Sequence, residues 1–306
     1  MTLKQIEVYA PASIANLGPG FDVFGIALDD IGDVLRLEIS SDSDISVFVR
    51  GLDAGSIPLD VRANSAGAVL KRAVELSDSE CGFRAEIVKG VPPGKGLGSS
   101  GASAAAAAYG ANELLRLALS KRELIALAAV GEAAVAGSAH ADNVSASLLG
   151  GFVMVGADFD AISLEPPCIE LVIAVPEISY ENKTKLARSL LPKQVELKDA
   201  VRNVGNASRM AAAVALKDPM LFGRNICDCL IEPRRAEMIP NFWKVKEEAL
   251  KAGAYGCSIA GGGPSVFAVG EDSARIGDAM ARTFMEVGVE SEIFYTRPSA
   301  RGVRVI

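Results

Sequence analysis

Residues 91–103 read Val91-Pro92-Pro93-Gly94-Lys95-Gly96-Leu97-Gly98-Ser99-Ser100-Gly101-Ala102-Ser103, and an alanine-rich run follows at 104–108. The two prolines favour a rigid, extended approach, whereas the glycines permit backbone conformations that other residues resist. The serines are good residues for a helix N-terminus, and alanine is the strongest helix former. A helix N-terminus with exposed amides attracts anions, most often phosphate. The stretch therefore predicts a phosphate-binding loop that opens a helix.

Two other interpretations of this stretch remain open. Gly96, Gly98 and Gly101 match the G-x-G-x-x-G pattern of dinucleotide-binding enzymes, which would make the protein an oxidoreductase. That pattern should leave a strand directly and meet an acidic residue at the end of a second strand about 20 residues later. Here a Pro-Pro-Gly loop intervenes, and Glu123 lies in a helical pattern. The second alternative is a flexible turn that only caps a buried alanine-rich helix.

Composition favours a cytoplasmic enzyme that acts on small molecules. The chain has 306 residues, half of them hydrophobic, and a formal net charge of -7. This length suits two domains, and the negative charge argues against nucleic acid or an anionic membrane as a partner. We find no signal peptide pattern and no apolar run of membrane-spanning length. The five cysteines lack metal-ligand spacing, which indicates reduced thiols.

Hydrophobic periodicity predicts alternating strands and helices. Strands are expected at 6–10, 23–28, 33–40, 45–50, 83–88, 150–155, 169–175, 265–269 and 290–295, with a glycine-rich loop at 16–22. Helices are expected at 65–76, from the phosphate loop to about 119, at 121–135 with a continuation over 131–144, and at 181–188, 195–216, 220–227 and 273–287. Prolines and polar residues cluster at 160–167, which suggests domains over 1–165 and 166–306.

Three motifs together resemble those of the GHMP kinases. The first is Ala10-Pro11-Ala12-Ser13-Ile14-Ala15-Asn16-Leu17-Gly18-Pro19-Gly20-Phe21-Asp22, the second is the phosphate loop, and the third is Ser258-Ile259-Ala260-Gly261-Gly262-Gly263-Pro264-Ser265. They occur in the family's order and span nearly the whole chain. The resemblance implies a two-domain α+β fold, with a ribosomal-protein-S5-like N-terminal domain and a ferredoxin-like C-terminal domain.

The first motif is most similar to that of the family members that phosphorylate L-homoserine. The resemblance then implies transfer of the γ-phosphoryl group of ATP to the side-chain hydroxyl of L-homoserine, which gives O-phospho-L-homoserine and ADP in threonine biosynthesis. It implies Mg²⁺ as the metal. Oligomeric state stays open, with a homodimer as one alternative.

The resemblance also implies which residues hold ATP and metal. Ser100 and Glu132 would coordinate Mg²⁺, a hard cation that prefers a few oxygen ligands beside substrate phosphates. The ATP-binding residues would be Asn64, Pro92, Pro93, Gly94, Lys95, Gly96, Leu97, Gly98, Ser99, Ser100, Gly101, Ala102, Thr184 and Gly262.

The acceptor would lie among residues distant in the sequence. Those implied to bind it are Asn16, Asp22, His140, Arg188 and Arg235, and those implied in catalysis are Asn143, His140, Arg188 and Thr184. Asp22 suits an ammonium group, and arginines suit a carboxylate because a guanidinium binds it in a two-pronged manner.

Other interpretations of single residues stay open at this point. His140 is the only histidine, and a lone histidine beside small residues is more often a hydrogen-bonded structural residue than a catalyst. Arg234 competes with Arg235 for the carboxylate, and Asp142 is left open as a base. For the whole chain, the alternatives are a GHMP kinase for mevalonate or shikimate and a non-catalytic small-molecule sensor on the same fold.

Overall fold

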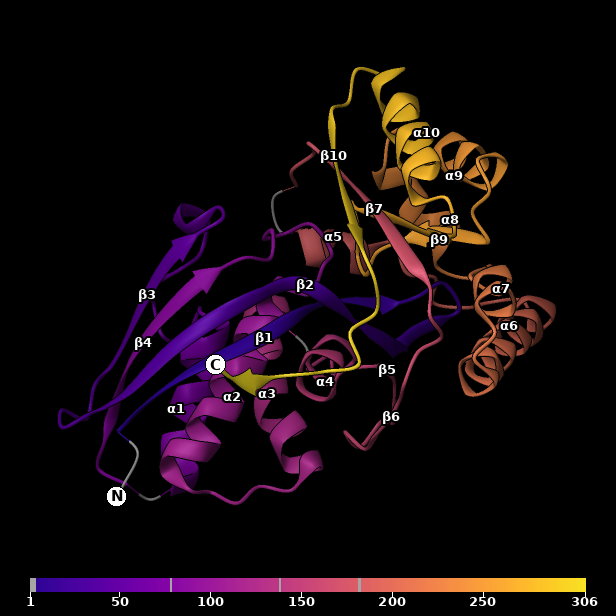
Figure 1. Cartoon of the computed structure of the whole chain (residues 1–306). Helices are drawn as coiled ribbons and strands as arrows, with labels where there is room; N and C mark the ends of the chain where they lie inside the picture. Colours follow the sequence, from indigo (N-terminus) through magenta and orange to yellow (C-terminus); the bar gives the residue numbers. More distant parts are fainter. Residues whose placement is uncertain (1–3, 78, 138, 181–182) are drawn as a thin grey trace.

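A computed structural model of the chain describes residues 4–77, 79–137, 139–180 and 183–306, without the side chains of 136 and 183–185. It contains two β-sheets, each covered by helices (Figure 1). None of the helices in these described ranges is long and apolar enough to cross a membrane.

The first sheet contains most of the N-terminal half. Its central strands run in the order β11-β1-β2-β4-β3, with β5 beside β2 and β6 beside β5. The strands are β1 (Gln5–Asn16), β2 (Gly20–Ser40), β3 (Ile45–Gly51), β4 (Gly82–Lys89), β5 (Phe152–Val155), β6 (Ala161–Leu164) and β11 (Arg304–Val305). A short 3-10 helix, Ala54–Ser56, follows β3.

Helices lie on one face of this sheet (Figure 1). They are α1 (Ser65–Ser77), α2 (Ser99–Leu115), α3 (Lys121–Ala136) and α4 (Asp142–Leu149). Helix α3 packs against the other three rather than directly on the strands. Helix α2 is the central one, and its alanines at 104–108 are fully buried. Their small side chains let its backbone approach the sheet. The approach is close, since even a Cβ at Gly110 of the same helix would lie 3.2 Å from the Leu37 side chain. The alanine run is therefore a packing feature as well as a helix former.

The second sheet is antiparallel and has the order β10-β7-β9-β8, which is that of a ferredoxin-like domain, the type that the resemblance implies. Its strands are β7 (Glu170–Pro176), β8 (Gly256–Ile259), β9 (Val266–Gly270) and β10 (Ser291–Thr296). The helices around it are α5 (Lys183–Ser189), α6 (Leu197–Leu216), α7 (Pro219–Arg224), α8 (Glu232–Arg235), α9 (Phe242–Lys251) and α10 (Ser273–Met285), with a 3-10 turn at Ala236–Met238.

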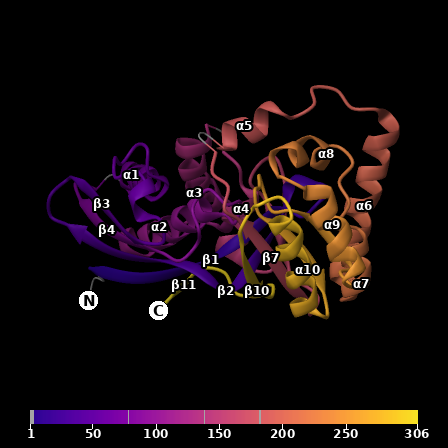
Figure 2. The ribbon, with the colours of Figure 1, turned by 90° about the horizontal axis from the view of Figure 1, so that it is seen from above.

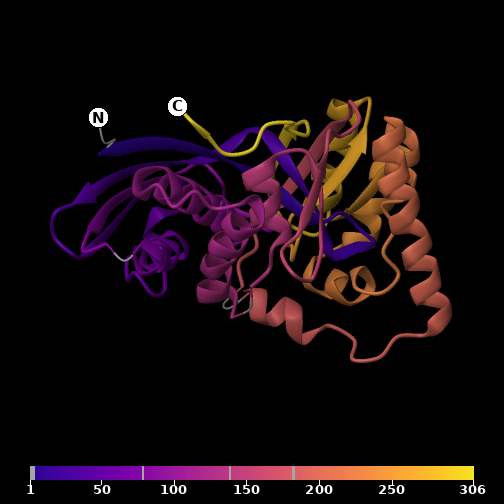
Figure 3. The same ribbon diagram turned by 90° about the horizontal axis from the view of Figure 1, so that it is seen from below.

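Strand β7 is buried on both faces, as its unbroken apolar run predicts. Val172 and Ala174 belong to a core shared with α9 and α10, whereas Leu171 and Ile173 join the core of the first sheet. Viewed from above, α9 and α10 lie at the opposite end of the molecule from α1–α3 (Figure 2). Helix α6 runs along the outer edge and is joined to α5 by a long connection (Figure 3).

The last ten residues return to the first sheet. Arg304 and Val305 pair with β1, and Pro298 forms a bridge with Leu28. Residues at the end of the chain thus belong to the sheet that its beginning forms. The division into 1–165 and 166–306 stays a prediction.

Several predicted elements differ from those in the structure. The strands expected at 23–28 and 33–40 form the single strand β2. The strand passes through Asp30, which has a left-handed conformation with a φ of 58°. Helix α2 ends at Leu115 rather than near 119, because Arg116 and Ala118 adopt positive φ. The continuation of α3 toward 144 is wrong, since Gly137 ends α3. Strands β6 and β8 are too short for periodicity to reveal.

Candidate active site

The phosphate loop joins β4 to α2, and its glycines are required by geometry. Gly94, Gly96 and Gly98 all have positive φ values. A Cβ at Gly98 would lie 2.2 Å from Ser13 Oγ and 2.8 Å from Asn143 Oδ1, and one at Gly96 would lie 2.3 Å from the Ala260 carbonyl oxygen. No side chain fits at either position. The loop is thus enclosed by the first motif, by α4 and by the third motif.

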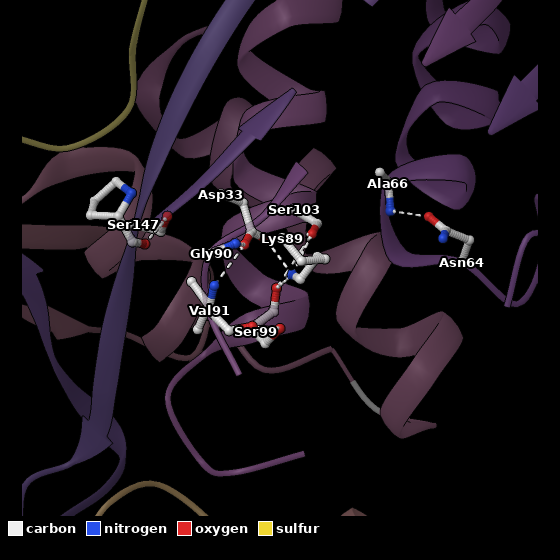
Figure 4. A network of polar contacts seen from close by, with 10 residues as sticks. Asp33, Asn64, Ala66, Lys89, Gly90, Val91, Ser99, Ser103 and Ser147 are labelled. Atoms are coloured by element: carbon white, nitrogen blue, oxygen red, sulfur yellow. Dashed lines mark hydrogen bonds and ion pairs between the residues drawn. The ribbon is translucent and has the colours of Figure 1, made fainter. Parts of the chain in front are cut away.

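A buried ion pair lies at the base of this loop (Figure 4). Lys89 Nζ contacts Asp33 and donates hydrogen bonds to the Ser99 carbonyl oxygen and to Ser103 Oγ, both at 2.9 Å. Asp33 also accepts hydrogen bonds from the Gly90 and Val91 amides at 3.1 Å. Burial lowers the pKa of Lys89, and Asp33 opposes that shift. Neither residue was among those predicted for the site.

The loop also contacts the second sheet through Lys95. Its Nζ donates to the carbonyl oxygens of Pro176 at 3.0 Å and Ile178 at 2.9 Å, and its own carbonyl oxygen accepts from the Ser265 amide at 3.2 Å. The turn of the third motif, with Gly262 at its centre, therefore lies against the phosphate loop. The structure brings these two predicted ATP-binding segments together.

The first motif contains the end of β1, the tight turn at 17–19 and the start of β2. Asn16 and Asp22 both adopt left-handed backbone conformations, with φ values of 70° and 55°. Asn16 Oδ1 accepts from the Asp22 amide at 3.1 Å, and its Nδ2 donates to the Gly261 carbonyl oxygen at 2.9 Å. Strained backbone of this kind persists where surrounding contacts enforce it, often at functional sites.

Arg235 comes to the same place from α8. Its Nη1 donates to the Gly261 carbonyl oxygen at 3.0 Å, and its guanidinium lies 5.1 Å from the centre of the Phe21 ring. Its Nε is buried and has no hydrogen-bond partner among the described residues. Arg234 points to solvent. A small cavity of about 10 Å³ beside Arg235 is lined also by Asn16, Phe21 and Gly261. The geometry favours Arg235 over Arg234 as the residue that binds an anionic group.

Arg188, Asp22 and His140 form a second cluster at the same site. Arg188 Nη2 lies 3.2 Å from both carboxylate oxygens of Asp22 and 2.8 Å from His140 Nδ1. The Arg188 guanidinium also lies 6.0 Å from the Phe21 ring centre. Burial lowers the pKa of His140. The charge of Asp22 opposes this shift, and the charges of Arg188 and Arg235 add to it. The five residues predicted to bind the acceptor thus lie together.

Asp142 and Asn143 begin α4 and lie between this cluster and the phosphate loop. Asn143 Oδ1 accepts from Ser13 Oγ at 2.9 Å. The buried Asp142 accepts from the Asn143 amide at 2.8 Å. Burial, followed by the nearby negative charge of Asp22, raises the pKa of Asp142 to about 7. A carboxyl group poised near neutral pH is typical of functional sites.

The predicted metal ligands lie on adjacent helices. Glu132 is buried on α3, next to Gly131, where a Cβ would lie 2.8 Å from Ala104 Cβ in the first turns of α2. Ser100, in the first turn of α2, is partly exposed. The described residues contain no group of three or more His, Cys, Asp or Glu that suits a metal. One carboxylate and one hydroxyl fit Mg²⁺, which takes its other ligands from phosphates and water.

Two predicted site residues are placed less directly. Asn64 caps α1: its Oδ1 accepts from the Ala66 and Gly67 amides, and its Nδ2 donates to the Pro58 carbonyl oxygen. Thr184 lies in α5, and its side chain is outside the described part of the chain. Their assignments to ATP binding, and that of Thr184 to catalysis, stay predictions, as do the roles of the other predicted site residues.

Comparisons with known proteins identify the family. The family models "GHMP kinases N terminal domain" and "GHMP kinases C terminal" match residues 64–151 and 210–286. A homoserine kinase of Methanocella arvoryzae is 42% identical over 99% of this chain and 98% of its own length. A homoserine kinase of Natronomonas pharaonis is 44% identical over 95% of this chain and 97% of its own length.

A solved structure is also similar along the full length. The crystal structure of homoserine kinase from Cytophaga hutchinsonii covers 100% of this chain and 98% of its own, with a TM-score of 0.92 and 38% identity. Fold, site geometry and sequence identity point the same way. The chain belongs to the GHMP kinase family and, within it, to the homoserine kinases.

Proposed function

We propose that the protein transfers the γ-phosphoryl group of ATP to the side-chain hydroxyl of L-homoserine, which gives O-phospho-L-homoserine and ADP. The observation that carries this proposal is the position of Asp22, Arg188 and Arg235 around Phe21, beside a glycine-rich helix N-terminus. An amino-acid site next to a phosphate site is what this reaction requires. The reaction is a step of threonine biosynthesis.

The acceptor's two charged ends have matching partners. The ammonium group of L-homoserine would bind Asp22, and its carboxylate would bind Arg188 and Arg235. The buried Arg235 Nε has a donor to spare for this carboxylate. A buried donor without a partner carries a desolvation cost, which an acceptor oxygen would remove. Mevalonate and shikimate carry no ammonium group, so Asp22 favours an amino acid over either of them.

ATP would place its phosphates on the loop between β4 and α2. The amides that begin α2 and its dipole supply the positive potential there. Lys95 would add a cation if it leaves the Pro176 and Ile178 carbonyl oxygens. Mg²⁺ would be held by Ser100 and Glu132 and would neutralise charge on the β- and γ-phosphates. Asn64, Thr184 and Gly262 complete the proposed ATP site.

Catalysis would rest on positioning and charge neutralisation. A phosphoryl-transfer transition state is loose, so the protein mainly aligns the two substrates and stabilises charge. Arg188, His140 and Asn143 would act between the phosphate loop and the acceptor, and we propose that Thr184 acts with them. Ser13 Oγ donates to Asn143 Oδ1, and Asn143 Nδ2 makes one long hydrogen bond, of 3.5 Å, to Asp142 Oδ1. The second N–H of Nδ2 would donate toward a phosphoryl oxygen. No strong general base is assigned.

The test is ATP consumption with Mg²⁺ against five acceptors: L-homoserine, L-serine, mevalonate, shikimate and galactose. We expect turnover with L-homoserine and little with the others. Turnover with a different acceptor would keep the ATP site and overturn the substrate. ATP binding without turnover of any acceptor would favour a small-molecule sensor.

A further inference from the structure

The two ends of the phosphate loop are fastened to one buried ion pair. Asp33 and Lys89 lie on the adjacent strands β2 and β4, and their side chains are 1% and 2% exposed. Asp33 accepts from the Gly90 and Val91 amides, where the chain leaves β4. Lys89 donates to the Ser99 carbonyl oxygen and to Ser103 Oγ, where α2 begins. Where the loop starts and where it ends are therefore set by the same two side chains.

This network uses every polar group that it contains. An ammonium group has three donors, and those of Lys89 go to Asp33, Ser99 and Ser103. Ser103 Oγ in turn donates to Asp33 Oδ2 at 2.7 Å, and Ser99 Oγ donates to the Val91 carbonyl oxygen at 3.0 Å. A fully satisfied polar network in a dry interior holds its members in one arrangement.

Stability alone does not explain the pair. Replacement of a buried ion pair by apolar residues of similar size is often neutral or stabilising. Here an apolar pair would leave the Gly90 and Val91 amides and the Ser103 hydroxyl without their acceptor. Direct contact with ATP is also excluded for Lys89 in this arrangement, since its ammonium group is buried and all its donors are used.

We propose that Asp33 and Lys89 are positioning residues for ATP, which aim the first amides of α2 and the Ser100 hydroxyl at the phosphates. This inference rests on the proposed function, because it takes the loop to be the ATP site. A displacement of about 1 Å at a reacting group is enough for a 100-fold loss of rate. Loss of this pair should therefore impair the binding and alignment of ATP and leave the acceptor site intact.

The experiment compares Lys89→Met with a control of similar structural cost. Met280→Ala removes a fully buried side chain from α10, in the core of the second sheet, away from the loop. For each variant we would measure unfolding midpoint, binding of Mg-ATP by calorimetry, and KM for ATP and L-homoserine. We expect Lys89→Met to weaken ATP binding and raise the KM for ATP at least about tenfold, as for a misplaced hydrogen bond to a charged group, with KM for L-homoserine within twofold.

The control separates positioning from general destabilisation. Met280→Ala should lower the unfolding midpoint and leave both KM values unchanged. If Lys89→Met behaves in the same way, the pair is structural and the inference is wrong. Ser103→Ala is a milder variant that removes one hydrogen bond from each member of the pair. It should raise KM for ATP by a smaller factor, and an unchanged value would contradict the proposal even if Lys89→Met fails to fold.

The readouts also separate this inference from the proposed function. If the unaltered protein binds Mg-ATP but does not phosphorylate L-homoserine, the proposed substrate fails. The calorimetric comparison of Lys89→Met with Met280→Ala then still tests the positioning role. If the unaltered protein does not bind Mg-ATP, both fail together.

Discussion

Arg188 Nη2 lies 3.2 Å from both carboxylate oxygens of Asp22, although the two residues are 166 positions apart in the chain. Asp22 lies near the start of β2, and Arg188 comes from α5 beside the second sheet. The two groups neutralise one another across the site. An amino acid carries the same pair of charges, so L-homoserine would exchange this internal ion pair for two contacts with its own ammonium and carboxylate groups.

Asp22→Asn tests the ammonium contact. A hydrogen bond to a charged group is worth about 1.5–3 kcal/mol, so KM for L-homoserine should rise about 10- to 100-fold with KM for ATP unchanged. Initial-rate kinetics with L-homoserine and with 4-hydroxybutyrate, which lacks the amino group, would show the variant losing its preference between them. Asp30→Asn is the matched control, because Asp30 is an exposed residue of the same strand with a similar φ of 58°. If Asp22→Asn and Asp30→Asn lose the preference for L-homoserine equally, Asp22 does not bind the ammonium group.

Arg235→Lys tests the carboxylate contact, and its neighbour supplies the control. Arg235 is 6% exposed and Arg234 points to solvent. Lysine keeps the charge but loses the fork of donors, including the buried Nε. KM for L-homoserine should rise about tenfold or more in Arg235→Lys, as expected for a lost charged hydrogen bond. Arg234→Lys should match the unaltered protein, and the opposite ranking would assign the role to Arg234.

Glu132→Gln tests the metal site. The amide keeps the size of the side chain but removes the charge that attracts Mg²⁺, so the Mg²⁺ concentration for half-maximal rate should rise at least about tenfold. Glu113→Gln, an exposed carboxylate near the other end of α2, is the control and should need no more Mg²⁺ than the unaltered protein. An unchanged Mg²⁺ requirement in Glu132→Gln would remove Glu132 from the site.

The phosphate loop was predictable because its signals are local. Glycines, serines and the alanine run lie within about twenty residues and specify a loop and a helix start by themselves. The capping box that joins Ser120 and Glu123 at the start of α3 is local in the same way. By contrast, the Asp29–Asp33 segment of β2 has the composition of a turn, yet the strand runs through it. A register shift against β1 between Pro11 and Ser13 accommodates this irregular backbone.

The Asp33–Lys89 pair was not predictable, since strand register brings these residues together. In sequence, Asp33 is one of several acidic residues after β2 passes Leu28, and Lys89 is a lysine at a strand end. Their 56-residue separation becomes a contact only when Val34 pairs with Val88. Residue types alone also did not show that Asp22, Arg188 and Arg235 lie together. The resemblance to known kinases indicated those three, whereas only strand pairing in the structure brings Lys89 to Asp33.

Asp142 leads to a prediction about pH. Its pKa is raised to about 7 in the folded protein, whereas an unfolded chain has an aspartate pKa of about 3.9. The folded state therefore holds the proton more tightly, and this contribution to stability is complete below about pH 4 and is lost as pH rises toward 7. The loss approaches about 1.4 kcal/mol per pH unit within that window. Asp142→Asn, which cannot ionise, should gain stability relative to the unaltered protein from pH 4.5 to pH 8 in urea unfolding.

Turnover of Asp142→Asn decides whether this carboxyl group is also a base. An amide oxygen can still accept the Asn143 amide hydrogen bond, so α4 should begin as before. Without a base, kcat should stay within about tenfold, because general-base catalysis contributes about 10²- to 10⁴-fold. A loss beyond about a thousandfold, in a variant that unfolds cooperatively, would make Asp142 the group that accepts the hydroxyl proton. A stability difference that does not change with pH would instead mean that Asp142 is ionised throughout, and its raised pKa would be wrong.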